Sequence, residues 1–161
     1  MIELTQYYQQ KKTPEISGKL TLPIEQRVRS RIKAQLDDGR SAGIFLPRGN
    51  LLRGGDLLCN HDGVIIEVVA ANETVTTVYA DDSTDLARAA YHLGNRHIPL
   101  QVENGWLRYQ HDHVLDDMLI QMGLKISVEQ APFEPESGAY QQAPHSHHSH
   151  NHDHNHKHHH A

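Results

Sequence analysis

The sequence predicts an α+β protein with a small all-β domain, then a ferredoxin-like βαββαβ domain, then a disordered histidine-rich tail. From Lys19 to about Ala71, short apolar segments alternate with turn residues, as in a chain of short strands. After Asn72, strand patterns alternate with two helical patterns. From about Glu134 the residues are mostly Pro, Glu, Ser, Gly, Gln and His, which cannot bury enough apolar surface to order the chain. We therefore expect domains at residues 1–72 and 73–133 and a flexible tail at 134–161.

The first domain is predicted to be a small barrel or sandwich. Polar and apolar residues alternate over 20–22, 27–31 and 32–36, and this period of two is typical of strands. Asp38-Gly39 predicts a hairpin turn, with residues 44–46 returning on its far side. Further turn residues separate these segments from a strand at 64–69, and several short strands at this spacing favour a closed or two-layered β fold.

The second domain opens with a strand over residues 75–79 and a helix. Asp82-Ser83 is a suitable N-cap, and four apolar residues follow at helical spacing. Gly94 comes just after the last of them and is expected to stop the helix. The helical positions are Leu86, Ala89, Ala90 and Leu93.

A hairpin and a second helix complete this domain. Asn104-Gly105 is a strong two-residue hairpin signal and places Val102 opposite Leu107. A second helix over 115–122 is expected to end at Gly123, before a final strand over 124–128. In this ferredoxin-like order both helices cover one face of a four-stranded sheet, and the other face is free for a partner.

Composition excludes several classes of protein. The 161 residues contain 15 Lys+Arg and 20 Asp+Glu, for a net charge of −5, so nucleic acid is not an expected partner. The single cysteine, Cys59, excludes an intramolecular disulfide and is expected to be a small buried residue. The N-terminus lacks signal-peptide features and no apolar run is long enough to span a bilayer, so we expect a cytoplasmic protein with no membrane contact.

The tail predicts metal binding. Imidazole is a common ligand of Ni²⁺, Cu²⁺ and Zn²⁺, and ten of the last 17 residues are histidine. Their interleaving with Ser, Asn, Asp and Lys is unlike a purification tag. The candidate tail ligands are His145, His147, His148, His150, His152, His154, His156, His158, His159 and His160.

Three histidines outside the tail are further candidate metal ligands. His97 lies between the helix stop at Gly94 and Pro99, so we expect a rigid loop of the kind that a metal ligand needs. His111 and His113 flank Asp112, the expected N-cap of the second helix. Positions two apart do not share a helical face, so this pair are either ligands on non-helical backbone or polar residues at a helix start.

The remaining chemistry-bearing residues do not form an enzyme site. His61 lies in a turn and is expected to be exposed, and His92 is expected to be a surface or satisfied core residue. The chain has no zinc-protease, paired-cysteine, nucleophile-elbow or phosphate-loop motif. We therefore expect a binding protein rather than an enzyme.

The motifs around His97 resemble those of one family. Gly94-Asn95-Arg96-His97, with Tyr91-His92-Leu93 before it, Ile98-Pro99-Leu100-Gln101-Val102 after it, the triplet at 111–113 and the polyhistidine end, closely resembles the UreE family of urease accessory proteins. The resemblance covers essentially the whole chain. It implies a nickel metallochaperone for the urease active site, with an N-terminal domain that contacts protein partners and a C-terminal ferredoxin-like domain that binds metal.

The resemblance also implies roles for individual residues. In the family the histidine matching His97 comes from both subunits of a homodimer, and positions matching His111 and His113 are linked to additional metal sites. The implied partners are the urease apoprotein and the accessory proteins, including the urease accessory GTPase. Two other functions stay open at this point: an assembly chaperone or peptide-binding module for apo-urease, and a general buffer of Zn²⁺, Cu²⁺ and Ni²⁺.

Overall fold

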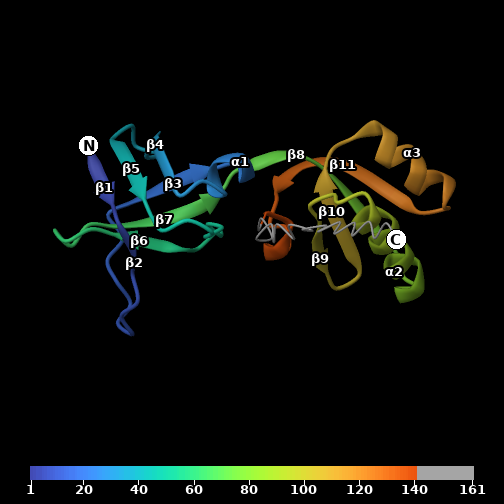
Figure 1. The fold of residues 1–161 in the computed structure, drawn as a ribbon, viewed down its shortest axis with the longest axis horizontal. Coiled ribbons are helices and arrows are strands. Elements are labelled where there is room, and N and C mark those ends of the chain that lie inside the picture. Colours follow the sequence, from blue (N-terminus) through green and yellow to red (C-terminus); the bar gives the residue numbers. More distant parts are fainter. Residues whose placement is uncertain (141–161) are drawn as a thin grey trace, which may run out of the picture.

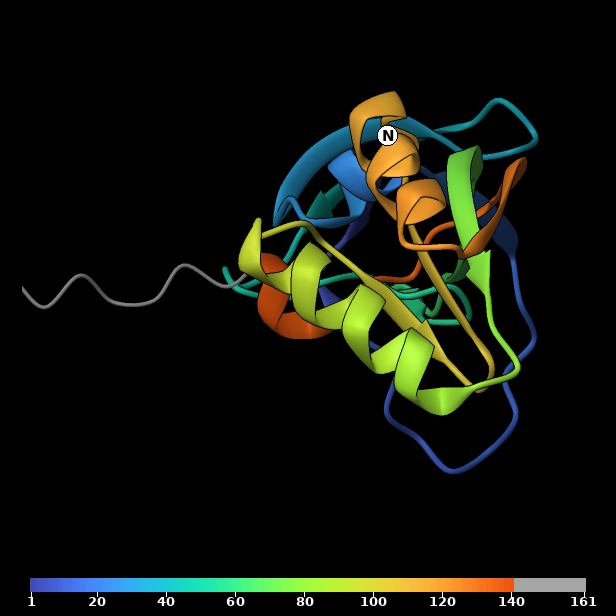
Figure 2. The ribbon, with the colours of Figure 1, turned by 90° about the vertical axis from the view of Figure 1, so that its right-hand side faces the viewer.

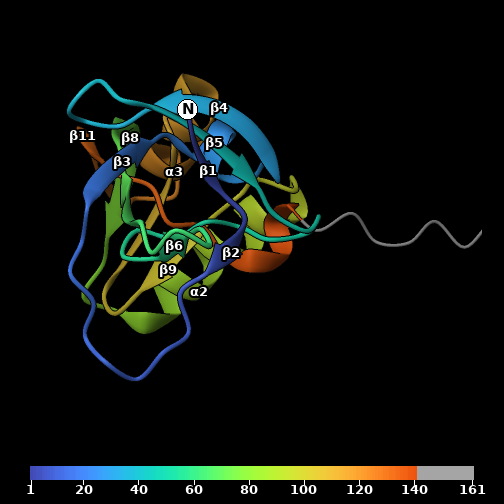
Figure 3. The same cartoon turned by 90° about the vertical axis from the view of Figure 1, so that its left-hand side faces the viewer.

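The computed structural model describes residues 1–140, which form two domains lying end to end (Figure 1). The N-terminal domain has two sheets, and in Figure 3 β4 and β5 lie above β6. Leucine, isoleucine and valine side chains from both sheets form its core. One sheet has the order β1 (Ile2–Leu4), β5 (Ser41–Phe45), β4 (Arg31–Gln35), and the other β2 (Gln6–Tyr7), β6 (Leu57–Cys59), β7 (Ile65–Ala70), β3 (Gly18–Leu22).

Several local predictions for this domain are confirmed. β4 and β5 pair antiparallel across the turn that contains Asp38 and Gly39, where Gly39 has a φ of +92°. A positive φ is readily adopted only by glycine, which explains the Asp-Gly signal. Cys59 is buried, as expected for a small apolar side chain.

Residues 27–31 do not form the strand that their alternation predicted. Residues Ile24–Arg27 form the short helix α1, and β4 begins only at Arg31. Pro23 precedes α1, and its ring and missing N–H suit the start of a helical turn. The alternation was misleading because Arg27 is a fully buried cation and not a solvent-facing strand residue.

The C-terminal domain has the predicted βαββαβ order. Its sheet order is β11-β8-β10-β9 with every neighbouring pair antiparallel, which is the ferredoxin-like arrangement. Figure 2 looks onto the two helices, which lie together on one face of the sheet. The elements are β8 (Asn72–Tyr79), α2 (Ser83–Asn95), β9 (Gln101–Glu103), β10 (Trp106–Gln110), α3 (His113–Gln121) and β11 (Lys125–Pro132).

The predicted hairpin has the predicted register. Val102 pairs with Leu107 across Asn104-Gly105, and Gly105 has a φ of +82°. Leu107 is buried, whereas Val102 is exposed because β9 is the edge strand of the sheet. On the opposite face of the sheet, the guanidinium of Arg108 lies 4.4 Å from the ring centre of Trp106.

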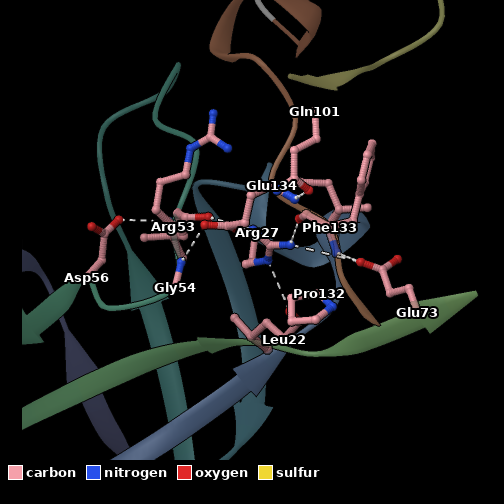
Figure 4. A network of polar contacts seen from close by, with 12 residues as sticks. Leu22, Arg27, Arg53, Gly54, Asp56, Glu73, Gln101, Pro132, Phe133 and Glu134 are labelled. Atoms are coloured by element: carbon pink, nitrogen blue, oxygen red, sulfur yellow. Dashed lines mark hydrogen bonds and ion pairs between the residues drawn. The ribbon is translucent and has the colours of Figure 1, made fainter. Parts of the chain in front are cut away.

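The two domains meet around the buried side chain of Arg27 (Figure 4). This side chain donates to the carbonyl oxygens of Leu22, Leu52 and Phe133 and to the Glu134 carboxylate. Glu73 adds a second carboxylate at 3.9 Å. Burial lowers the pKa of Arg27, and the two carboxylates oppose this shift. Arg27 thus connects α1, the loop before β6, β8 and the segment after β11.

Residues 134–140 do not belong to a flexible tail, contrary to our expectation. Phe133 is fully buried, and residues Ser137–Tyr140 form the 3-10 helix η1. Glu134 accepts a hydrogen bond from the Gly54 amide, and the Glu136 amide donates to the Leu100 carbonyl at 2.8 Å. Composition did not predict this because the segment is held by contacts of Phe133, Glu134 and Glu136 with residues distant in the chain. The ten tail histidines lie outside the described residues.

None of the helices formed by residues 1–140 is long and apolar enough to cross a lipid bilayer.

Candidate metal-binding site

Helix α2 positions His97 at its C-terminal end. The helix begins at the predicted N-cap, where the Asp82 carboxylate accepts from the Thr84 amide at 2.8 Å. It does not stop at Gly94, as we predicted, but continues to Asn95. Gly94 thus lies within the helix, Arg96 is the C-cap, and His97 follows it.

The backbone of His97 is left-handed, with a φ of +56°. Its amide donates to the Gly94 carbonyl at 3.0 Å, and the Ile98 amide donates to the Leu93 carbonyl at 3.3 Å. These two bonds define a Schellman motif with His97 at the C′ position, where glycine is usual. Leu93 and Ile98 also pack in the same hydrophobic cluster, so the turn is fixed from both sides.

His97 is the one non-glycine residue with a positive φ in residues 1–140. Such a conformation costs about 1–2 kcal/mol for a residue with a Cβ. His97 is also exposed, so burial of its ring does not offset this cost. A residue that is unfavourable for the fold and rigidly presented to solvent is a strong candidate for function.

His111 and His113 lie at the start of α3. Asp112 is the N-cap, as predicted, and accepts from the amides of Val114 and Leu115 at 2.9 and 3.3 Å. His111 precedes the cap and His113 is the first helical residue, so the pair spans the change from extended to helical backbone.

The two rings have different surroundings. Nδ1 of His111 lies 3.1 Å from Oδ2 of Asp116 and 3.2 Å from Oγ1 of Thr76. His113 is exposed, and its ring makes no hydrogen bond to any residue within 1–140.

The Asp116 carboxylate belongs to a buried polar cluster that sequence reasoning missed. Tyr109 donates to it at 2.5 Å and Thr76 at 2.8 Å. Burial, with the nearby Asp116 carboxylate, raises the pKa of Tyr109 far above its usual value, so the phenol stays protonated and donates. The available signal was an acidic residue inside the apolar stripe of α3, between Leu115 and Leu119.

The C-terminal end of α2 and the N-terminal end of α3 border the same hollow on the surface. Ile98 and Pro99, which follow His97 directly, line a hollow of about 220 Å³ together with His111 and Asp112. The other histidines lie elsewhere: His61 is in an exposed turn, as predicted, and His92 is on the surface with its ring edge-on to Tyr91 at 5.3 Å.

The segment that precedes the tail also lies near His97. Glu136 is bonded to Leu100, which is three residues after His97, so its backbone lies within roughly 15 Å of that residue. Figure 2 shows η1 beside the segment that follows α2. By contrast, no three His, Cys, Asp or Glu side chains within 1–140 converge on a possible metal position.

Comparisons with known proteins decide the family. The model of the UreE urease accessory protein N-terminal domain matches residues 4–71, and that of the C-terminal domain matches residues 73–160. The chain belongs to the UreE family of urease accessory proteins. As a UreE-family member it acts in urease maturation and is a chaperone rather than an enzyme, which confirms the expectation of a binding protein.

Curated relatives span nearly the same length. The urease accessory protein UreE of Pseudomonas putida strain GB-1 is 59% identical over 148 residues, which cover 91% of this chain and 90% of the relative. That of Citrobacter koseri is 54% identical, with 92% of this chain and 97% of the relative covered. That of Alcanivorax borkumensis is 59% identical over 76% of this chain and 73% of the relative.

Proposed function

We propose that this protein is a nickel metallochaperone that carries Ni²⁺ as its cargo and delivers it for maturation of the urease active site. The observation that carries the proposal is His97, an exposed imidazole held in a left-handed C′ position beside the start of a histidine-rich tail. Imidazole is a suitable ligand for Ni²⁺, and a rigidly held donor favours a defined site.

The described residues of one chain offer too few ligands for a complete nickel site. Residues 1–140 of one chain offer no convergent set of three donors, whereas Ni²⁺ with nitrogen and oxygen ligands favours four to six in tetragonal or octahedral geometry. We propose a homodimer in which His97 from both subunits binds one ion. His111, His113, tail histidines, water and a second dimer are the candidates for the remaining positions.

In our proposal, the tail supplies further imidazole donors to this site. His145 is nine residues after Glu136, so it reaches up to roughly 30 Å from the point where the chain is bonded to Leu100. That reach exceeds the distance from Leu100 to His97. A tethered ligand at this range has an effective concentration of order millimolar, enough to collect an ion and exchange it with a fixed site. The collecting ligands are His145, His147, His148, His150, His152, His154, His156, His158, His159 and His160.

The proposed partners follow from the same role. Cargo for the urease active site must pass to the urease apoprotein and its accessory proteins, including the urease accessory GTPase. We assign contact with these proteins to the N-terminal β domain and place the protein in the cytoplasm.

Calorimetric nickel titration tests the proposal. Four proteins are compared: the full chain and a chain ending at Gln142, each with and without His97→Ala. We expect truncation to remove weak sites and His97→Ala to remove the tight site, which is shared by two subunits. Full-length His61→Ala is the matched control, because that histidine is exposed in a turn away from the site.

Two outcomes would contradict the proposal. Loss of all tight binding on truncation, with no effect of His97→Ala, would make the tail the only site. Unchanged urease activation by the truncated His97→Ala chain would favour a metal-independent assembly chaperone. Competition with Zn²⁺ and Cu²⁺ then distinguishes a nickel carrier from a general buffer, since imidazole alone binds Cu²⁺ more strongly than Ni²⁺.

A further inference from the structure

A buried carboxylate lies between α3 and the sheet. Asp116 is 6% exposed, and Tyr109 and Thr76 beside it are fully buried. Oδ1 of Asp116 accepts from the Tyr109 hydroxyl at 2.5 Å and from the Thr76 hydroxyl at 2.8 Å. These two donors fix the carboxylate and leave its second oxygen, Oδ2, directed at His111 at 3.1 Å.

The contacts of His111 define which of its ring nitrogens carries hydrogen. Nδ1 faces Oδ2 of Asp116 and, at 3.2 Å, Oγ1 of Thr76. The carboxylate can only accept a hydrogen bond. The single hydroxyl hydrogen of Thr76 is already donated to Asp116, so toward Nδ1 its oxygen also accepts. Both neighbours therefore require a hydrogen on Nδ1.

We infer that Asp116, held by Tyr109 and Thr76, is a positioning residue that locks His111 in its Nδ1–H tautomer and presents Nε2 as a metal donor. The inference rests on the proposed metal-binding function and names the residue that sets the tautomer of this ligand. A carboxylate on the far nitrogen orients a ligating imidazole and increases its basicity. The Nε2–H tautomer, which is usual for histidine in water, would instead block that nitrogen.

Stability of the fold alone does not account for this cluster. Asp116 lies on the core side of α3 next to Leu115, and a buried carboxylate must be desolvated. An apolar residue of similar size commonly serves as well or better at such a position. The cluster also distinguishes His111 from His113: both are exposed, but of the two rings only that of His111 has hydrogen-bond partners within residues 1–140. His111 is thus the prepared ligand of the pair.

Nitrogen NMR of the metal-free full chain tests the inference directly. Long-range proton–nitrogen spectra of ¹⁵N-histidine-labelled protein, recorded where histidines are neutral, distinguish the two tautomers. The His111 signals are identified by their loss in His111→Gln. We expect the Nδ1–H pattern in the wild type and a change toward Nε2–H in Asp116→Ala.

The control is Asp117→Ala, which removes the same charge from the exposed neighbouring position and should leave the tautomer unchanged. An Nε2–H pattern in the wild type would overturn the inference even if Asp116→Ala failed to fold. Retention of Nδ1–H in folded Asp116→Ala would overturn it as well.

A second measurement follows the metal. Ni²⁺ added below stoichiometry is expected to broaden the His111 signals before those of His113, and this order should disappear in Asp116→Ala. Earlier broadening of His113 in the wild type would contradict the inference. Because the tautomer is measured without metal, its result stands apart from the nickel titration of His97 variants, so failure of either proposal is recognised separately.

Discussion

The two helices of the ferredoxin-like domain end in the same backbone motif with different residues. At the end of α3, the Gly123 amide donates to Ile120 at 2.9 Å and the Leu124 amide to Leu119 at 3.1 Å. The end of α2 repeats this pair of bonds. The equivalent C′ residues are Gly123, with a φ of +81°, and His97, with a φ of +56°.

Only one of these two C′ residues suits its backbone conformation. Gly123 is the residue that the motif favours, because it has no Cβ to oppose a left-handed backbone. His97 satisfies the same hydrogen bonds at an energetic disadvantage, and η1 leads into the tail beside it. The end of α3 is therefore explained by folding alone, whereas the end of α2 fits the presentation of an imidazole that we propose.

The largest expected effect is on the free energy of unfolding and concerns Arg27, which binds the segment after β11. Arg27→Ala removes the buried cation that binds Glu134 and Phe133 and leaves Glu73 and Glu134 without it. Breaking a buried ion pair in this way costs about 3–5 kcal/mol. Urea unfolding should show this loss, while Arg29→Ala, an exposed cation in the next turn, should stay within about 0.5 kcal/mol of the wild type. If the two variants were equally stable, the contacts of Arg27 would not contribute to stability as predicted.

Nickel affinity should distinguish the two helix ends next. Loss of a residue that only orients a metal ligand typically weakens binding about 10–100-fold, so loss of the ligand itself in His97→Gly should weaken the tight site at least tenfold. Gly123→Ala changes the equivalent position of α3 and should leave nickel affinity unchanged. Calorimetry on both variants checks this, and similar affinities would show that the end of α2 is not special.

Stability should respond to the substitution at α3. Gly123→Ala places a Cβ on a left-handed residue and should lower the free energy of unfolding by about 1–2 kcal/mol. Apart from its chain neighbours, no atom of residues 1–140 lies within 4 Å of the position of that Cβ, so the cost is conformational and not steric. Chemical denaturation measures it. A neutral effect would mean that the motif tolerates any residue, and His97 would lose its significance.

The smallest effect has the opposite sign. His97→Gly should stabilise the fold by up to about 1 kcal/mol, since the relief of left-handed strain exceeds the extra entropy that glycine has in the unfolded chain. His97→Ala keeps a Cβ and should show no such gain. A thermal shift assay on metal-free protein separates the two. Destabilisation by His97→Gly would indicate that the ring contributes to folding.

Sequence reasoning succeeded where one local pattern determines the structure. The period of apolar residues gave both helices, and Asn104-Gly105 gave the register of Val102 with Leu107. Asp82 and Asp112 act as the N-caps that their positions predicted. Each of these features depends on residues close together in the chain.

It failed where partners are distant in the chain. Arg27 is bonded to residues more than 100 positions away, so an alternating segment was misread as a strand. The same bonds, with that of Glu136 to Leu100, hold the segment from 133 onward, which composition assigned in part to the tail. At the site, His97 lies in a fixed turn, as expected. The helix end was wrongly predicted at Gly94. The contact between Asp116 and His111 was not predicted.

The left-handed backbone at residue 97 has a consequence for protein engineering. A design procedure that selects the most stable residue at each position would choose glycine there, as the chain itself does at 123. The resulting protein would fold at least as well and would lack its proposed fixed ligand. Residues with a positive φ and a coordinating side chain should therefore be held constant when UreE proteins are stabilised for use.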